Sequence, residues 1–247
     1  GSPLAVAIGD LDGDGKPDLV IANETGNSIS VFRNVSSTGS LTTSSFATKV
    51  DFSAGSGPSA VALSDVDGDG RLDVIVVNLG DSTVSVLRNT TAGTGLDANS
   101  LAARVNFTTG SLPRRLALGD FDGDGKPDLA VGNTGSDTVS IFRNTGTPGT
   151  VSSGSFAAKI DLVPVSTPSQ FAIGDVDGDG KVDLVVPSAG TVSVFRNIAT
   201  AGTLTTASFQ TRVDFTATSP IGPLALADVD GDGKPDILSS FGGANSA

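Results

Sequence analysis

Short runs of apolar residues recur along the chain, and four of them fill each period of 55 residues. The first two runs are continuous, as in Leu4 to Ile8 and Leu19 to Ala22, which predicts strands buried on both faces. The third run alternates Ile29 and Val31 with small hydroxyl residues, and this pattern predicts a strand with one wetter face.

The fourth run alternates apolar and charged residues, since Val50 and Phe52 are separated by Lys49 and Asp51. Charges at alternate positions suit an outer edge strand that must not pair with another molecule. A gradient from buried to charged over four antiparallel strands, repeated at this spacing, is what a propeller blade requires. A β-sandwich would not repeat this way, and no window has a sustained helical period. The sequence therefore predicts an all-β propeller made of 55-residue, four-stranded antiparallel blades.

Two markers give the limits of the repeat. The first marker is the segment D-x-D-G-D-G-x-x-D, which begins at Asp10, Asp65, Asp120, Asp175 and Asp228. The spacings between these copies are 55, 55, 55 and 53 residues. Prolines recur 55 residues apart throughout, at Pro3, Pro58, Pro113, Pro168 and Pro223, which places the two-residue shortening between Pro223 and Asp228. We predict one propeller domain, 1–247, with repeat units 3–57, 58–112, 113–167, 168–222 and a partial fifth, 223–247.

The acidic segment has the ligand spacing of a metal loop. In its first copy Asp10, Asp12, Asp14 and Asp18 stand at positions 1, 3, 5 and 9, and a glycine at position 6 permits a sharp turn. Four carboxylates this close would repel by roughly 1 to 4 kcal/mol per pair, so the loop needs a cation to stay compact. The backbone carbonyl of Lys16 is placed to act as a fifth ligand.

About seven oxygen ligands per loop suit calcium better than magnesium, and a chain without His or Cys lacks the usual ligands of zinc. We predict five calcium ions, one per loop, held by side chains at positions 1, 3, 5 and 9 and by the carbonyl at position 7. These residues are Asp10, Asp12, Asp14, Lys16, Asp18, Asp65, Asp67, Asp69, Arg71, Asp73, Asp120, Asp122, Asp124, Lys126, Asp128, Asp175, Asp177, Asp179, Lys181, Asp183, Asp228, Asp230, Asp232, Lys234 and Asp236. Metal-free Asp-Gly hairpin turns are the alternative, which five full matches in register disfavour.

Composition excludes several functions. The net charge of −12 argues against nucleic acid or an anionic membrane surface as a partner, and no apolar stretch approaches the roughly 20 residues that cross a bilayer. Chemistry that depends on a thiol, an imidazole or a phenol is excluded, because the chain has no Cys, His or Tyr. The acids outside the loops offer no obvious convergent pair, so we predict that the chain is not an enzyme.

The loops, together with runs such as Gly119 to Ala130, resemble FG-GAP or VCBS-type repeats, which build the propeller of integrin α subunits and of many bacterial surface proteins. The resemblance implies a calcium ion in the turn between the first two strands of each blade, and a secreted or cell-surface location. The signatures that name the family are not intact, with Gly57-Pro58 and Gly222-Pro223 as partial remnants. The fifth repeat stops after its second strand, whereas propellers of this family usually have seven or eight blades.

We expect a calcium-stabilised extracellular adhesion or scaffold module that presents loops to a glycan or protein partner, with self-association through the incomplete last blade. A carbohydrate-binding lectin is the alternative, and the propeller part of a secreted polysaccharide-degrading enzyme is a third. The connections Thr90 to Ala103 and Thr145 to Ala157 are either binding loops or solvated linkers. An arginine follows each third strand, at Arg33, Arg88, Arg143 and Arg196. We expect it to pair with a neighbouring blade or cap a strand end rather than face an acidic partner.

Overall fold

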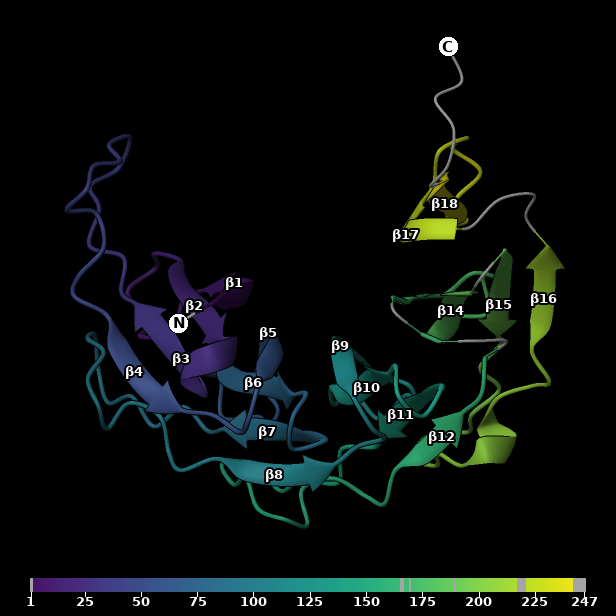
Figure 1. Cartoon of the computed structure of the whole chain (residues 1–247), viewed down its shortest axis with the longest axis horizontal. Helices are drawn as coiled ribbons and strands as arrows, with labels where there is room; N and C mark the ends of the chain where they lie inside the picture. Colours follow the sequence, from purple (N-terminus) through teal and green to yellow (C-terminus); the bar gives the residue numbers. More distant parts are fainter. Residues whose placement is uncertain (1, 165–166, 169, 189, 217–220, 242–247) are drawn as a thin grey trace. The chain divides into compact units, whose positions relative to one another are not determined.

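The structure is a computed structural model that describes residues 2–164, 167–168, 170–188, 190–216 and 221–241. The chain folds into two compact units, Gly1–Thr109 with Thr145–Phe156, and Gly110–Asn144 with Ala157–Ala247. Both units consist of antiparallel sheets with turns and loops between them (Figure 1). Residues 242–247 of the predicted fifth repeat lie outside the described residues.

The first unit contains two four-stranded sheets, each with its strands in chain order. Blade 1 consists of β1 (Pro3–Gly9), β2 (Asp18–Asn23), β3 (Ser28–Phe32) and β4 (Val50–Ser53), with the short 3-10 turn η1 (Glu24–Gly26) between β2 and β3. Blade 2 consists of β5 (Pro58–Ser64), β6 (Asp73–Asn78), β7 (Thr83–Leu87) and β8 (Val105–Thr108).

The second unit contains two more sheets of this kind and a two-stranded one. Blade 3 consists of β9 (Pro113–Gly119), β10 (Asp128–Asn133), β11 (Thr138–Phe142) and β12 (Ile160–Leu162). Blade 4 consists of β13 (Ala172–Gly174), β14 (Asp183–Ser188), β15 (Thr191–Phe195) and β16 (Val213–Thr216), with η2 (Thr206–Ser208) before β16. The fifth repeat supplies β17 (Ile221–Ala227) and β18 (Asp236–Phe241). The four-stranded, propeller-like blades predicted from the sequence are therefore confirmed.

Neighbouring blades within a unit pack face to face through the alternate residues of their central strands. In the first unit Val20, Ile29 and Val31 of blade 1 share a buried cluster with Val74 and Val76 of blade 2. In the second unit the equivalent residues of blades 3 and 4 form a second cluster, which includes Ala130, Ile141, Leu184 and Val186. β-branched side chains fit these flat, doubly covered sheets, which is why they dominate the apolar runs.

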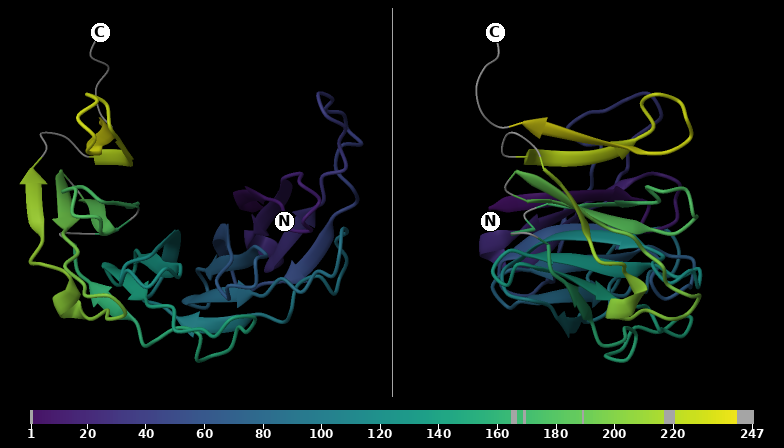
Figure 2. Two further views of the ribbon diagram at one scale, coloured as in Figure 1. Left: turned by 180° about the vertical axis from the view of Figure 1, so that it is seen from behind. Right: turned by 90° about the vertical axis from the view of Figure 1, so that its right-hand side faces the viewer.

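Neither helical turn of the described chain is long enough to cross a membrane. The connection from β3 to β4 in blade 1 extends away from its own sheet (Figure 2). Its tip is exposed, with Leu41 at 79%.

Two burial predictions were wrong. The first strand of a blade is not buried on both faces, since Val6 and Ile8 are 58% and 64% exposed and β9 carries two exposed arginines. The reason is that this face of a first strand is covered only where another blade lies against it, since Val61 and Leu63, one repeat later, pack against the cluster between blades 1 and 2. The third strand is not wetter on one face, because its central serine is buried in every blade, at Ser30, Ser85, Ser140 and Ser193.

These serines are buried because each one joins a chain of hydrogen bonds across its blade. In blade 2 the Nδ2 group of Asn78 donates to Ser85 Oγ over 2.7 Å, and Ser85 Oγ donates to Asn106 Oδ1 over 2.8 Å. In blade 1 the equivalent serine, Ser30, donates from Oγ to Asp51 Oδ1 over 2.6 Å. The charged fourth strand is thus an exposed edge, as predicted, whose acids also accept hydrogen bonds from the blade interior.

The two-residue shortening lies elsewhere than predicted. The last pair of the β6–β7 hairpin, Asn78 and Thr83, encloses four residues, whereas the last pair of the β14–β15 hairpin, Ser188 and Thr191, encloses two. In the fifth repeat Ile221 pairs with Phe241 as Pro58 pairs with Asn78, so Ile221 and not Pro223 has the place of the recurring proline. The proline spacing gave the wrong location because Pro223, two residues after Ile221, happens to lie 55 residues after Pro168.

Replacing Ser85 tests the buried chain of hydrogen bonds. Ser85→Ala removes the acceptor of Asn78 and the donor to Asn106, while Asn78 remains fully buried. We expect a loss of about 1 to 3 kcal/mol in the free energy of unfolding, measured by urea denaturation. Thr43→Ala, at an exposed position of a loop, is the control and should change it by less than about 0.5 kcal/mol. Equal values for the two variants would contradict this account.

Candidate metal centres

The five acidic segments form the turns between the first and second strands of the repeats, and we call them loops 1 to 5. Loop 1 covers residues 10–18, and its backbone wraps around the side chain of Asp10. The Oδ1 atom of Asp10 accepts from Gly13 N at 2.8 Å and its Oδ2 atom accepts from Gly15 N at 2.8 Å. Both glycines have positive φ, 73° and 83°, which explains why the motif needs glycine there.

The structure brings together positions 1, 3 and 9 of every loop. One carboxylate oxygen from each of the three aspartates lies within 4.8 Å of the other two. The groups are Asp10, Asp12 and Asp18; Asp65, Asp67 and Asp73; Asp120, Asp122 and Asp128; Asp175, Asp177 and Asp183; Asp228, Asp230 and Asp236. The position-5 aspartates are not members of these groups. Ligation by position 5 and by the position-7 carbonyls stays a prediction.

The aspartate at position 9 is the most buried member of the group. Asp18, Asp73, Asp128 and Asp183 have no exposed surface, and each is the first residue of a second strand. Asp73 accepts hydrogen bonds from Val66 N at the start of its loop and from Asn89 N beyond β7, at 3.1 and 2.8 Å. One carboxylate thus joins three segments of the blade.

Burial controls the ionisation of these groups. Loss of hydration, opposed by backbone hydrogen bonds and reinforced by the neighbouring aspartates of the loop, raises the pKa of Asp73 to about 6. The same causes raise the pKa of Asp128 to about 7. The pKa values of Asp18 and Asp183 are also raised, first by burial. A buried carboxylate among other carboxylates is unfavourable without a cation to offset its charge.

The sequence reasoning missed an asparagine that ties loops 1 and 3 to the following blade of their unit. In the first unit Asn89 Nδ2 donates to Leu72 O in its own blade and to Leu11 O in loop 1, at 3.0 and 2.8 Å. In the second unit Asn197 Nδ2 donates to Val182 O and to Phe121 O of loop 3. The sequence does contain a pattern that could have indicated this asparagine, because an Arg-Asn pair follows the third strand of each four-stranded blade.

The loop residue whose backbone carbonyl accepts this hydrogen bond, at position 2, also has a buried apolar side chain. Leu11 is 2% exposed and Phe121 is 1% exposed, and the ring of Phe121 contacts that of Phe209 edge to face at 6.2 Å. Each of these two loops is therefore fixed by a side chain and by a hydrogen bond to the next blade of its unit.

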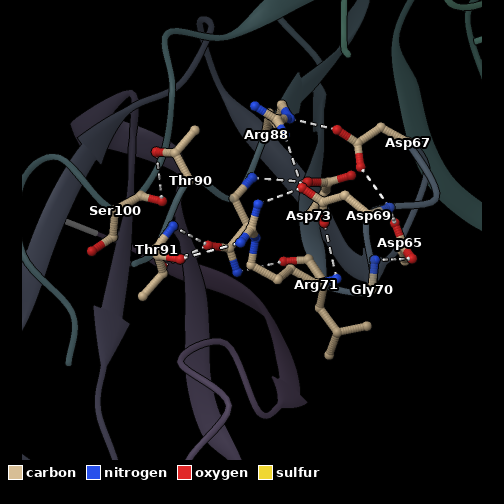
Figure 3. A network of polar contacts seen from close by, with 12 residues as sticks. Asp65, Asp67, Asp69, Gly70, Arg71, Asp73, Arg88, Thr90, Thr91 and Ser100 are labelled. Atoms are coloured by element: carbon tan, nitrogen blue, oxygen red, sulfur yellow. Dashed lines mark hydrogen bonds and ion pairs between the residues drawn. The ribbon is translucent and has the colours of Figure 1, made fainter. Parts of the chain in front are cut away.

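The recurring arginines have a structural role, as expected, but only Arg143 pairs with a neighbouring blade, and the other three bind aspartates of their own blade. Arg88 Nε donates to Asp67 Oδ2, and its Nη2 donates to Asp69 Oδ2 at 2.8 Å (Figure 3). Arg33 and Arg196 make the same two contacts in loops 1 and 4. Arg143 differs, because its Nη1 lies 3.7 Å from Asp122 Oδ2 and donates instead to Gly202 O at 2.7 Å.

Loop 5 keeps the turn but not the burial. Asp228 accepts from Gly231 N and Gly233 N as Asp10 does in loop 1, at 2.7 and 2.9 Å. All three members of its group are exposed. The described part of the fifth repeat ends with β18, and the arginine and asparagine of the other repeats follow a third strand.

The residues present fit a hard divalent cation. The buried Oδ2 atom of Asp122 has no hydrogen-bond partner among the described residues and lies 3.7 Å from Arg143 Nη1, so loop 3 holds a buried carboxylate oxygen whose charge is only partly offset. All donor atoms of the groups are carboxylate oxygens, which calcium prefers and zinc does not. The groups are therefore compatible with calcium.

Comparison with known families agrees with the loops and the blades. The model of the FG-GAP-like repeat matches residues 10–76, 65–131, 120–186 and 175–239, each match running from one acidic loop through the next. The chain belongs to the FG-GAP-like repeat family. No curated protein sequence matches it. The closer relation to integrin α subunits stays a prediction.

Solved structures share the fold of this FG-GAP-like repeat protein. BBS1N, solved in complex with ARL6DN, matches with a TM-score of 0.56 and 15% identity over 96% of this chain and 59% of its own. A lectin from Agrocybe aegerita, solved for its recognition of non-reducing terminal N-acetylglucosamine, matches with a TM-score of 0.58 and 19% identity. That match covers 94% of this chain and 59% of the lectin. The chain thus spans about three fifths of either protein, and the likeness is one of fold.

The raised pKa values predict how the calcium-free protein responds to pH. In the folded protein the pKa values of Asp73 and Asp128 are about 6 and about 7, whereas the ordinary value, which applies to the unfolded chain, is 3.8. The folded protein therefore binds these protons more tightly than the unfolded chain does. Their contribution to stability is complete below about pH 4 and is lost as the pH rises through 7. Asp51 and Asp175, whose pKa values are lowered, titrate below this window.

We therefore expect the free energy of unfolding after calcium removal to be larger at pH 5 than at pH 8 in urea denaturation. Saturating calcium should reverse this order, because the ion binds the deprotonated carboxylates. A calcium-free stability that rises between pH 5 and pH 8 would contradict the burial argument.

Proposed function

We propose that this chain is a calcium-binding extracellular adhesion or scaffold module without catalytic activity, in which calcium in the acidic loops makes the blades rigid. One observation carries the proposal: three aspartates converge in every loop, and in four loops the third is fully buried. Such groups repel one another and are poorly solvated, so they gain most from a divalent ion.

Calcium in these loops would stabilise more than the turns. Loops 1 and 3 each contact the following blade of their unit through position 2 and through the asparagine after its third strand. An ion that fixes such a loop also fixes this contact. Binding energy of this kind is folding energy, because the site does not exist in the unfolded chain.

The partner that we propose is an extracellular protein or a glycan. The net charge of −12 disfavours nucleic acid, and the two neighbours in fold were solved with a protein partner and as a lectin. A propeller-like fold supports many functions, so the neighbours indicate only the kinds of partner such blades accept.

Metal content and thermal unfolding test the calcium proposal. We expect about five calcium ions per chain and a melting temperature that falls by more than about 10 °C when a chelator removes them. Asp73→Asn should lose one ion, whereas Asp137→Asn, at an exposed turn with φ of 52°, should keep all five. A chain that melts at the same temperature with calcium, magnesium or chelator would refute the proposal.

A groove in the first unit favours glycan binding as a second candidate. A cavity of about 370 Å³ is lined by Phe52, Ser53, Arg104 and Asn106, among others. Arg104 Nη1 donates to Ser53 Oγ at 3.2 Å, and its Nε atom is buried without a hydrogen-bond partner among the described residues. An unused guanidinium donor suits the hydroxyl or carboxylate groups of a sugar, although the ring of Phe52 is only 9% exposed.

Glycan-array screening followed by calorimetry tests the groove. Arg104→Ala should weaken binding of any captured glycan at least about tenfold, because a buried donor to the sugar is lost. The matched control is Arg212→Ala, since Arg212 Nε already pairs with Asp214 and its Nη1 with Val163 O. Absence of any glycan ligand, or equal losses in both variants, would remove this candidate and leave the calcium proposal unaffected.

A further inference from the structure

The arginine after the third strand lies against the same carboxylates that would hold the metal. In loop 2 the guanidinium of Arg88 bridges Asp67 and Asp69 through two different nitrogens (Figure 3). Asp67 is also a member of the converging group with Asp65 and Asp73. The position-3 carboxylate therefore faces two cation sites, one occupied by a side chain of the protein.

This contact is mostly shielded from water and recurs in separate loops. The side chain of Asp67 has no exposed surface and that of Arg88 is 26% exposed. The Nη2 contact to position 5 measures 3.0 Å from Arg33, 2.8 Å from Arg88 and 2.9 Å from Arg196. A planar fork that spans two carboxylates neutralises part of their repulsion at a fixed separation, which a flexible ammonium does less well.

Loop 3 shows the same arginine without the hydrogen-bonded fork, since Arg143 Nη1 lies 3.7 Å from Asp122 Oδ2. Arg143 donates to Gly202 O in the next blade of its unit, and Asp122 Oδ2 is left without a hydrogen bond among the described residues. The position of the arginine in the sequence is the same as in the other blades. The guanidinium thus has two sets of acceptors, of which only one engages the loop aspartates.

We infer that Arg33, Arg88 and Arg196 are built-in counter-cations that keep loops 1, 2 and 4 folded when calcium is absent and compete with calcium for the position-3 aspartate. The inference rests on the proposed calcium binding. Two consequences follow from charge alone. Without the guanidinium the position-3 carboxylate of the calcium-free loop is uncompensated and the loop loses stability, although in loop 2 Asp69 keeps its contact with Arg71 Nη2 at 2.6 Å. The same loss of positive charge makes the loop more attractive to a dication.

Arg88→Gln in the full chain separates this role from that of a residue that merely positions calcium ligands. We expect the calcium-free melting temperature to fall and the rise on adding saturating calcium to become larger than in the wild type. Calorimetric titration should show one site that binds calcium about tenfold more tightly. Arg88→Lys, which keeps the charge but not the planar fork, should restore part of the calcium-free stability. A purely positioning arginine would give a smaller calcium-dependent rise and a weaker site.

Arg143→Gln is the matched control, because it removes the same side chain from a loop where the fork is not formed. It should leave the calcium-dependent rise close to that of the wild type. Arg33→Gln repeats the test in loop 1 if Arg88→Gln does not fold.

An unchanged or smaller calcium-dependent rise in Arg88→Gln or Arg33→Gln, or an equal increase in Arg143→Gln, would overturn the inference. A wild-type chain whose melting temperature does not respond to calcium would instead overturn the proposed function, so the two failures are distinguishable.

Discussion

The charge of a buried aspartate at the start of the second strand constrains the rest of each four-stranded blade. In loop 2 this residue, Asp73, receives backbone amides from the loop and from the segment beyond β7, so it connects the turn to the third strand. Those hydrogen bonds favour the charged form, while burial and the nearby carboxylates oppose it and prevail. The blade thus concentrates negative charge where hydration is weakest, and a divalent cation bound there would resolve that conflict.

The same loops provide the contacts between blades of a unit. Leu11 and Phe121 insert toward the following blade, and Asn89 and Asn197 reach back to the carbonyls of those two residues. A turn with a candidate metal site is therefore also part of a blade interface. This arrangement explains how a protein with long Ser- and Thr-rich connections and no disulfide can obtain rigid packing from small β-branched cores.

Loop 5 shows what the third strand contributes. Its turn is closed by the same backbone hydrogen bonds as in the other loops, yet Asp236 is exposed where Asp18, Asp73, Asp128 and Asp183 are not. Turn geometry depends on residues at most five apart, whereas burial of position 9 depends on the strands around it. The loop motif by itself is sufficient for the turn and insufficient for the buried site.

The sequence by itself determined the repeat, the order of four strands in each blade, the place of the loops and the aspartates that converge in them. These features are local: strand pattern has a period of two residues, and Asp10 bonds to amides three to five residues away. Tertiary structure decided which groups are buried. It covered the serine of the third strand, paired Arg33 with residues 19 and 21 positions earlier, and joined Asn89 to a carbonyl 78 positions earlier. Such contacts depend on how strands and blades pack, which no pattern along the chain records.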